Sequence, residues 1–343
     1  MKKYWFYLII LGLFIGANLY YIHDNSYQET LIAYVEEDTK EDDFDNINLP
    51  EGIWRYGGSS SWVPIREQFE EAIKTTHPQF ILKYVDSTEE APSSETGIKM
   101  LLNGEIDFSL SSRILKKEEH QIAKQKGFKL KEIPVAVDGI AIAVNHSLNI
   151  SGLTVAQLRS IYTGKIRNWQ DLGGPSLPIK PYSRPLKESA TVEFFKHEVL
   201  RDQNFADNIK FVEITTQGLK KVANETGAIY YASAPEIVPL CSIKSLAIGE
   251  RLDQLISPYK KPFISSEECP QQRNQVNLQA LHSHTYPFSR PLYVIVKNED
   301  DKKVLQKDKY KAAQAYTKLF QTDRGHSLIQ KAGFIPIANK NNK

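Results

Sequence analysis

An arginine, two hydroxyl side chains and the expected start of a helix come together between residues 181 and 195. Arg184 lies in a proline-flanked turn, and Ser189, Ala190 and Thr191 follow just before an apolar run with helical spacing. A serine N-cap leaves the first N–H groups of the helix able to bind an anion, and a guanidinium group matches tetrahedral or carboxylate oxygens. For this stretch taken alone, a capped helix beside a surface arginine is the favoured interpretation.

Further hydroxyl clusters follow predicted strands earlier in the chain. Ser60 and Ser61 stand in a Gly-Gly-Ser-Ser-Ser turn before a helix, and Ser94 lies where another helix begins. Ser112 and Arg113 end a third strand. Ligands of alternating α/β sheets bind at the carboxyl ends of strands, so these clusters are predicted to belong to one anion site. The glycines are expected to let the backbone approach the ligand closely.

The elements that must position these residues alternate between strands and helices. This alternation predicts a mainly parallel sheet with helices on both faces. The expected strands are 53–56, 80–85, 106–110, 130–137, 140–144, 179–182, 228–231 and 291–296. The expected helices include 116–126, 153–162, 217–224, 312–320 and 325–332. Asp138-Gly139 is placed in a turn between two strands, and residues 250–289 form a long irregular excursion.

Composition sets limits on the function. The 343 residues are enough for two lobes with separate cores, and a net charge of +2, from 43 Lys and Arg against 41 Asp and Glu, gives no support for a nucleic-acid partner. No Walker loop or GxGxxG motif occurs, so no nucleotide cofactor is expected. His282-Ser-His284 is the only close histidine pair, and we interpret it as a surface turn instead of a metal site.

The N-terminus carries an export signal. Lys2 and Lys3 precede an uncharged apolar run from Tyr4 to Tyr21, which we expect to be an uncleaved membrane anchor, with a removed signal peptide (residues 1–23) as the alternative. Residues 24–51 are acidic and are expected to form a solvated linker before a fold that begins near Gly52. Export places the chain outside the cytoplasmic membrane.

Two cysteines, Cys241 and Cys269, flank part of the proline-rich excursion. In an exported protein they can persist as a disulfide, and free buried thiols are the alternative.

With these motifs in view, the sequence resembles the phosphate-binding proteins that feed ATP-driven phosphate importers, and within them the branch found in cyanobacteria. The likeness extends over most of residues 52–337. Seven motifs in family order carry it: the Gly-Gly-Ser-Ser-Ser turn, Ser111-Ser112-Arg113, Val137 to Ala141, Leu153 to Trp169, Ser189-Ala190-Thr191, Ala228 to Pro235, and Ala332 to Pro336.

The resemblance implies a hinged, two-lobed α/β clamp of the periplasmic-binding-protein type (type II). Lobe 1 would comprise residues 52–137 and a return segment 290–343, and lobe 2 residues 138–289. The phosphate contacts that it implies are Ser60, the backbone of Ser61, Ser94, Arg184, Ser189, Ala190 and Thr191. The family triplet is usually Ser-Gly-Thr, so Ala190 is a departure.

A second departure concerns the group that accepts a proton from bound phosphate. Many relatives carry an aspartate where this chain has Ser112. We therefore assign the acceptor role to Asp138, with a plain Asp-Gly turn as the alternative. Arg113 is expected to add positive charge, with a salt bridge at the strand end as the alternative.

The expected function is binding of inorganic phosphate outside the membrane and its delivery to the permease of an ABC-type importer. A membrane-anchored phosphate sensor and a receptor for another tetrahedral oxyanion are the alternatives. No catalytic activity is expected, because Ser60, Ser94 and Ser189 have no histidine in a nearby motif and no carboxylate cluster for metal ions is evident.

Overall fold

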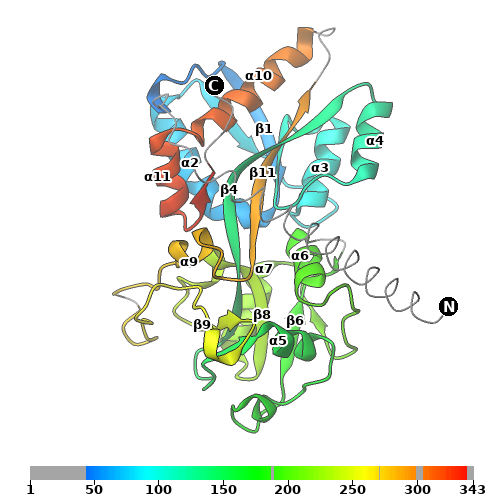
Figure 1. The fold of residues 1–343 in the computed structure, drawn as a ribbon. Coiled ribbons are helices and arrows are strands. Elements are labelled where there is room, and N and C mark those ends of the chain that lie inside the picture. The colour runs from blue at the N-terminus through cyan, green and yellow to red at the C-terminus, as the bar shows by residue number, and fades with distance from the viewer. Residues whose placement is uncertain (1–43, 187–188, 270, 299–303, 338–343) are drawn as a thin grey trace, which may run out of the picture. The chain divides into compact units, whose positions relative to one another are not determined.

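Two long strands, β4 (Lys129–Asn145) and β11 (Ser289–Asn298), lie side by side at the centre of the fold (Figure 1). The computed structural model describes residues 44–186, 189–269, 271–298 and 304–337, with the backbone alone at 298 and 304–307. In this part of the chain a ten-stranded sheet has the order β2-β1-β3-β11-β4-β8-β6-β7, and β9 and β12 also pair with β4.

We call the elements on the β2 side of this sheet lobe 1. Besides the adjoining parts of β4 and β11, its strands are β1 (Gly52–Gly58), β2 (Phe80–Tyr84), β3 (Phe108–Ser111) and β12 (Ile335–Pro336). Its helices are α2 (Val63–Thr76), α3 (Ser94–Asn103), α4 (Lys117–Gln125), α10 (Val304–Leu319) and α11 (Asp323–Lys331). Helices α2, α10 and α11 pack on one face in an aromatic core, and α3 and α4 pack in a second core (Figure 1).

Lobe 2 contains the elements between β4 and β11. Its strands are β5 (Gly152–Thr154), β6 (Lys180–Ser183), β7 (Lys210–Phe211), β8 (Ala228–Ser233), β9 (Ile243–Ser245) and β10 (Ala247–Gly249). Its helices are α5 (Val155–Tyr162), α6 (Ala190–Glu198), α7 (Thr215–Asn224), α8 (Ala234–Ile237) and α9 (Leu278–His282). The ring of Phe195 stacks on Tyr231 with centroids 3.7 Å apart, which fixes α6 against β8.

The sheet is mixed, so the prediction of a mainly parallel sheet was wrong at its centre. β1 is parallel to β2 and β3, and β6 is parallel to β7 and β8. β11 is antiparallel to β3 and β4, and β4 is antiparallel to β8. The reason is topological: the chain passes from lobe 1 to lobe 2 along β4 and returns beside it along β11.

The turn predicted at Asp138-Gly139 was also wrong, because β4 is continuous through both residues. Gly139 serves packing instead: a Cβ there would lie 2.6 Å from a methyl carbon of Leu281. The partner of β4 changes at this point, from Ser289 of β11 opposite Gly139 to Ser233 of β8 opposite Ile140.

The fold begins before Gly52, so the linker predicted to reach residue 51 is shorter. Phe44 opens a short 3-10 turn (Phe44–Asn46) and is fully buried against Phe69, and its carbonyl lies 2.9 Å from His77 Nε2. Asp45 pairs with Arg324. The buried side chains of Phe44 and Ile47 therefore tie part of an acidic stretch to the core. The expected anchor at residues 4–21 and most of the expected linker lie outside the described residues.

Gly58 has a role other than the predicted approach to a ligand. Its φ is +131°, and a Cβ there would lie 2.2 Å from the Leu110 carbonyl oxygen. Glycine is required because β1 pairs closely with the end of β3, and this contact positions the serine turn that follows.

The described residues of the predicted excursion form only short elements before β11, among them the 3-10 turn Leu252–Gln254 and α9. Cys241 is joined to Cys269 by a disulfide. No helix among the described residues has the length and apolar character to cross a membrane.

Candidate anion-binding site

Three helical segments begin at one site, and a serine caps each of them. Ser59 caps the 3-10 turn η2 (Ser60–Trp62), Ser93 caps α3, and Ser189 caps α6 by accepting from the Val192 N–H. The N–H groups of a first turn lack partners inside the helix and carry the positive end of its dipole. Ala190 is the first residue of α6 and has a helical backbone. The helix therefore starts normally, although this chain has alanine where the family triplet usually has glycine.

Buried hydroxyls connect η2 with α3. Ser112 Oγ lies 3.0 Å from Ser59 Oγ and 3.3 Å from Ser94 Oγ, and the Ser112 N–H donates to Ser94 Oγ at 2.9 Å. Trp62 donates its indole N–H to the Ser111 carbonyl at 3.0 Å, which locks the serine turn to the end of β3. The structure thus brings Ser94 and Ser112 together, as the sequence predicted for this end of the strands.

Arg290, which was not predicted from the sequence, is a buried cation that links the two lobes at this site. Its Nη2 donates to Ser61 Oγ of lobe 1 at 2.9 Å and to Thr191 Oγ1 of lobe 2 at 2.8 Å. Its Nε and Nη2 lie 3.2 and 3.1 Å from Asp138 Oδ2. Arg290 and Asp138 are direct cross-strand partners on β11 and β4, so the strand register sets their pairing.

One nitrogen of this guanidinium group, Nη1, is available to bind an anion. Arg290 is 2% exposed, and among the described residues its buried Nη1 has no hydrogen-bond partner. A buried N–H of this kind calls for a ligand, an ion or water as its acceptor. An oxyanion held between Ser61 and Thr191 would supply that acceptor.

Two acidic groups lie near the arginines. Burial raises the pKa of Asp138 even though the Arg290 charge and the hydrogen bonds from Ser233 and Arg290 lower it. Burial, reinforced by the charge of Asp138, raises the pKa of Glu236 on α8 to about 8, against the opposing effect of Arg290 and Arg184. Glu236 was not predicted from the sequence. Glu236 therefore has an increased tendency to hold a proton, whereas the Asp138 carboxylate is paired with Arg290.

Arg184 is buried at the predicted turn, and its Nη2 donates to the Pro92 carbonyl, just before α3, at 3.4 Å. It therefore reaches from lobe 2 to the segment that carries Ser94. Ser60 is half-buried at the start of η2, beside Ser61. These positions agree with a shared site.

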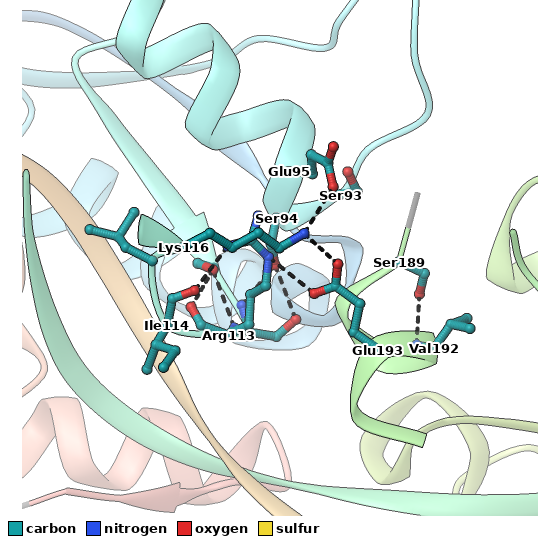
Figure 2. A network of polar contacts seen from close by, with 12 residues as sticks. Ser93, Ser94, Glu95, Arg113, Ile114, Lys116, Ser189, Val192 and Glu193 are labelled. Carbon is teal, nitrogen blue, oxygen red and sulfur yellow. Dashed lines mark hydrogen bonds and ion pairs between the residues drawn. The ribbon is translucent and has the colours of Figure 1, made fainter. Parts of the chain in front are cut away.

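Arg113 is directed elsewhere. Its guanidinium group binds Glu119 in two places, at 2.7 and 3.0 Å. Its Nε lies 3.3 Å from Glu193, toward which it points in Figure 2. The alternative of a salt bridge at a strand end describes this residue, and the structure gives no support to Arg113 as a direct ligand of the anion.

Among the residues that the structure describes, no three His, Cys, Asp or Glu side chains gather into a possible ion site. The set of donors instead consists of serine and threonine hydroxyls, helix N–H groups and arginine, all suited to an anion.

The sequence model of the PBP superfamily domain matches residues 50–324. The chain belongs to the PBP superfamily. This match and the α/β architecture confirm the predicted two-lobed fold of the periplasmic-binding-protein type.

Two sequence relatives show which proteins of the PBP superfamily this chain resembles. The phosphate-binding protein PstS of Staphylococcus saprophyticus is 29% identical over 296 residues, which cover 84% of this chain and 82% of the relative. The protein SphX of Synechococcus elongatus is 25% identical over 293 residues, or 82% of this chain and 77% of the relative. The predicted resemblance to phosphate-binding proteins is confirmed by these matches.

Among solved structures, a phosphate ABC transporter substrate-binding protein from Clostridium perfringens with bound phosphate has a TM-score of 0.65. It is 23% identical, and the match covers 83% of this chain and 100% of that chain. At 23% identity, this likeness shows that the chain shares the fold of that protein.

Proposed function

We propose that this protein binds inorganic phosphate outside the cytoplasmic membrane and delivers it to an ABC-type phosphate importer. The carrying observation is the buried Arg290, whose Nη2 joins Ser61 to Thr191 while its Nη1 lacks a partner among the described residues. The names of the relatives, phosphate-binding protein PstS among them, supply the identity of the anion.

Phosphate fits this set of groups better than a fully deprotonated oxyanion would. The helix starts at Ser60, Ser94 and Ala190 and the arginines donate hydrogen bonds, whereas Asp138 can accept one. Phosphate at neutral pH carries at least one proton and sulfate carries none, so a carboxylate acceptor favours phosphate. We assign this acceptor role to Asp138, together with a second role of holding Arg290 in place.

The protein acts as a receptor and not as an enzyme in this proposal. Ser94 Oγ is engaged with Ser112, and Ser189 Oγ accepts from the N–H of Val192. Such contacts serve capping and packing, whereas a nucleophilic serine needs a neighbouring base. Turnover of a chromogenic phosphate ester that disappears on Ser94→Ala or Ser189→Ala would contradict the receptor assignment.

The permease of the importer is the proposed partner, and residues 4–21 are the proposed membrane anchor. Sequencing the N-terminus of the mature protein distinguishes a retained anchor from a removed signal peptide.

Calorimetry of the wild-type protein with phosphate, arsenate and sulfate tests the function directly. We expect phosphate and arsenate to bind and sulfate to give no heat at matched concentration. Arg290→Gln should weaken phosphate binding by about 2–5 kcal/mol, because a charge-assisted donor is lost from a buried site. Equal binding of phosphate and sulfate by the wild-type protein would contradict the proposal.

Arg290→Gln also leaves Asp138 buried without its cation, which can destabilise the fold. Thr191→Val is therefore measured beside it, since it removes one hydroxyl and preserves the ion pair. A smaller but measurable loss of phosphate affinity is expected from Thr191→Val, at an unchanged thermal midpoint.

A further inference from the structure

An ion-pair network joins the two lobes next to the anion site. Lys116 Nζ lies 2.6 Å from Glu193 Oε1 on α6 and 3.4 Å from Glu95 Oε2 on α3 (Figure 2). Arg113 Nε lies 3.3 Å from Glu193 Oε2. Lys116 and Glu193 are 77 residues apart in the sequence, so the network is a tertiary contact between lobe 1 and lobe 2.

Both carboxylates occupy the first turns of helices that the anion site uses. Glu95 follows Ser94 at the start of α3, and Glu193 lies two residues after Thr191 on α6. Lys116 therefore holds the starts of the two helices near each other. A change in the separation of the lobes would change the Lys116–Glu193 distance and the spacing of the anion donors together.

The network also reduces an electrostatic repulsion between Glu193 and the anion. A glutamate in the first turn of a helix is favourable to the helix dipole, but its charge repels an anion bound at the same helix start. Lys116 and Arg113 neutralise much of that charge at Glu193. The side chains of Lys116 and Glu193 are 41% and 27% exposed, so water screens the pair and it can break and re-form as the lobes move.

We propose that Glu193, paired with Lys116 and Arg113, is a positioning residue that holds α6 against lobe 1 and thereby sets how slowly the bound anion leaves. The inference rests on the proposed phosphate-binding function for its ligand, and it adds a specific contact between the lobes that controls release. The network acts through the position of α6 and makes no direct contact with the anion.

The first test measures phosphate dissociation by stopped flow from the full-length protein. Glu193→Gln and Lys116→Gln should each release phosphate about fivefold faster than the wild type, the size expected for a partly exposed ion pair. Association rates should stay within about twofold, because the direct anion donors are unchanged. The double variant should accelerate phosphate release by less than the product of the two single effects, since both changes break the same Lys116–Glu193 pair.

The matched control is Asp207→Asn. Asp207 pairs with Arg167 at 2.9 Å entirely within lobe 2, so the substitution removes one negative charge and one ion pair without touching the contact between lobes. Its phosphate dissociation should equal that of the wild type. If Asp207→Asn accelerates dissociation as much as Glu193→Gln, the effect comes from net charge and the inference is overturned.

A second test requires no phosphate. Spin labels are attached at two exposed positions, Lys124 of α4 and Lys220 of α7, after the substitutions Lys124→Cys and Lys220→Cys. Double electron–electron resonance spectroscopy then measures the distance between the lobes. Glu193→Gln should broaden this distance distribution and shift it to longer values, whereas Asp207→Asn should not.

The two tests separate the two proposals. A wild-type protein that fails to bind phosphate refutes the proposed function, and the spin-label distances still decide the role of Glu193. A wild type that binds phosphate, with dissociation rates and distances unchanged in Glu193→Gln, refutes the inference alone. A lower thermal midpoint without either change would identify an ordinary stabilising ion pair and would also refute it.

Discussion

Two buried arginines reach the site from different lobes, Arg290 from β11 and Arg184 from the turn after β6. Their surroundings differ. Arg290 is held by the carboxylate of Asp138, whereas Arg184 lies against the carbonyl of Pro92. Loss of Arg184 therefore affects the anion without leaving the Asp138 charge unpaired.

Arg184→Ala is expected to weaken phosphate binding by about 2–5 kcal/mol, because it removes a charge-assisted donor from a buried anion. Titration calorimetry measures the change. Arg167→Ala is the control, since Arg167 is an exposed arginine of the same lobe paired with Asp207. Near-wild-type affinity in Arg184→Ala would place Arg184 outside the site.

Asp138→Asn is expected to lower phosphate affinity and to let sulfate compete. The Asp138 carboxylate accepts from Ser233 Oγ at 2.5 Å and from Arg290, and an amide in its place can donate to an unprotonated oxygen. Competition calorimetry with sulfate measures both effects.

Ser233→Ala is the control for Asp138→Asn, because it removes one hydrogen bond to the carboxylate and keeps its charge. This control should still exclude sulfate. If Asp138→Asn excludes sulfate as well and keeps its phosphate affinity, the proton acceptor is another group.

Local residue patterns predicted the hydroxyl side of the site and missed its central cation. Ser189 and Ser94 stand at helix starts, which short sequence patterns identify. Arg290 is the second residue of β11, directly before its apolar part, and its partner Asp138 is 152 residues away. The signal was a charged residue entering a buried strand, but the pairing depends on strand register that the sequence alone did not provide.

At the scale of elements, helix positions were predicted well and the central strands less well. Helix α5 follows its Thr154 cap as expected. The Asp-Gly pair in β4 had the residue types of a turn, but packing of Leu281 against Gly139 keeps the strand extended. Tertiary contacts thus overrode a local preference.

Helix α8 gives a prediction about pH. The pKa of Glu236 in its first turn is raised from 4.5 to about 8 by burial and by Asp138. A raised carboxyl pKa in the folded state contributes stability below the unfolded pKa, and this contribution is lost as the pH rises through about 8. The thermal midpoint of the wild type should therefore fall between about pH 5 and pH 9.

Glu236→Gln should reduce this fall, because an amide does not ionise. The remaining groups near Glu236 are Asp138, Arg184, Arg290 and Tyr230, which both proteins share. Thermal unfolding at closely spaced pH values compares the two. Parallel pH profiles would show that Glu236 ionises in the folded protein as it does in the unfolded chain.

At the scale of the whole molecule, the Cys241–Cys269 disulfide closes a separation of 28 residues around an excursion with little regular structure. Loss of a bridge of this size should cost roughly 2–4 kcal/mol of unfolding free energy. Denaturant unfolding of Cys241→Ser/Cys269→Ser against the wild type measures the loss.

Thiol labelling under denaturing conditions checks the bond itself. The wild type should show no reactive thiol before reduction and two afterwards. Two reactive thiols before reduction would mean that the cysteines are unpaired in the protein.

The return of the chain along β11 has a consequence for biosynthesis. Lobe 2 is one continuous segment between β4 and β11, but the aromatic core of lobe 1 includes Leu292, Val294, Tyr316 and Phe320 from the C-terminal part of the chain. During synthesis from the N-terminus, lobe 2 has all its strands before lobe 1 can close its core. The first part of the fold to be made is thus the last to be completed, and it exposes apolar surface to chaperones until β11 and α10 emerge.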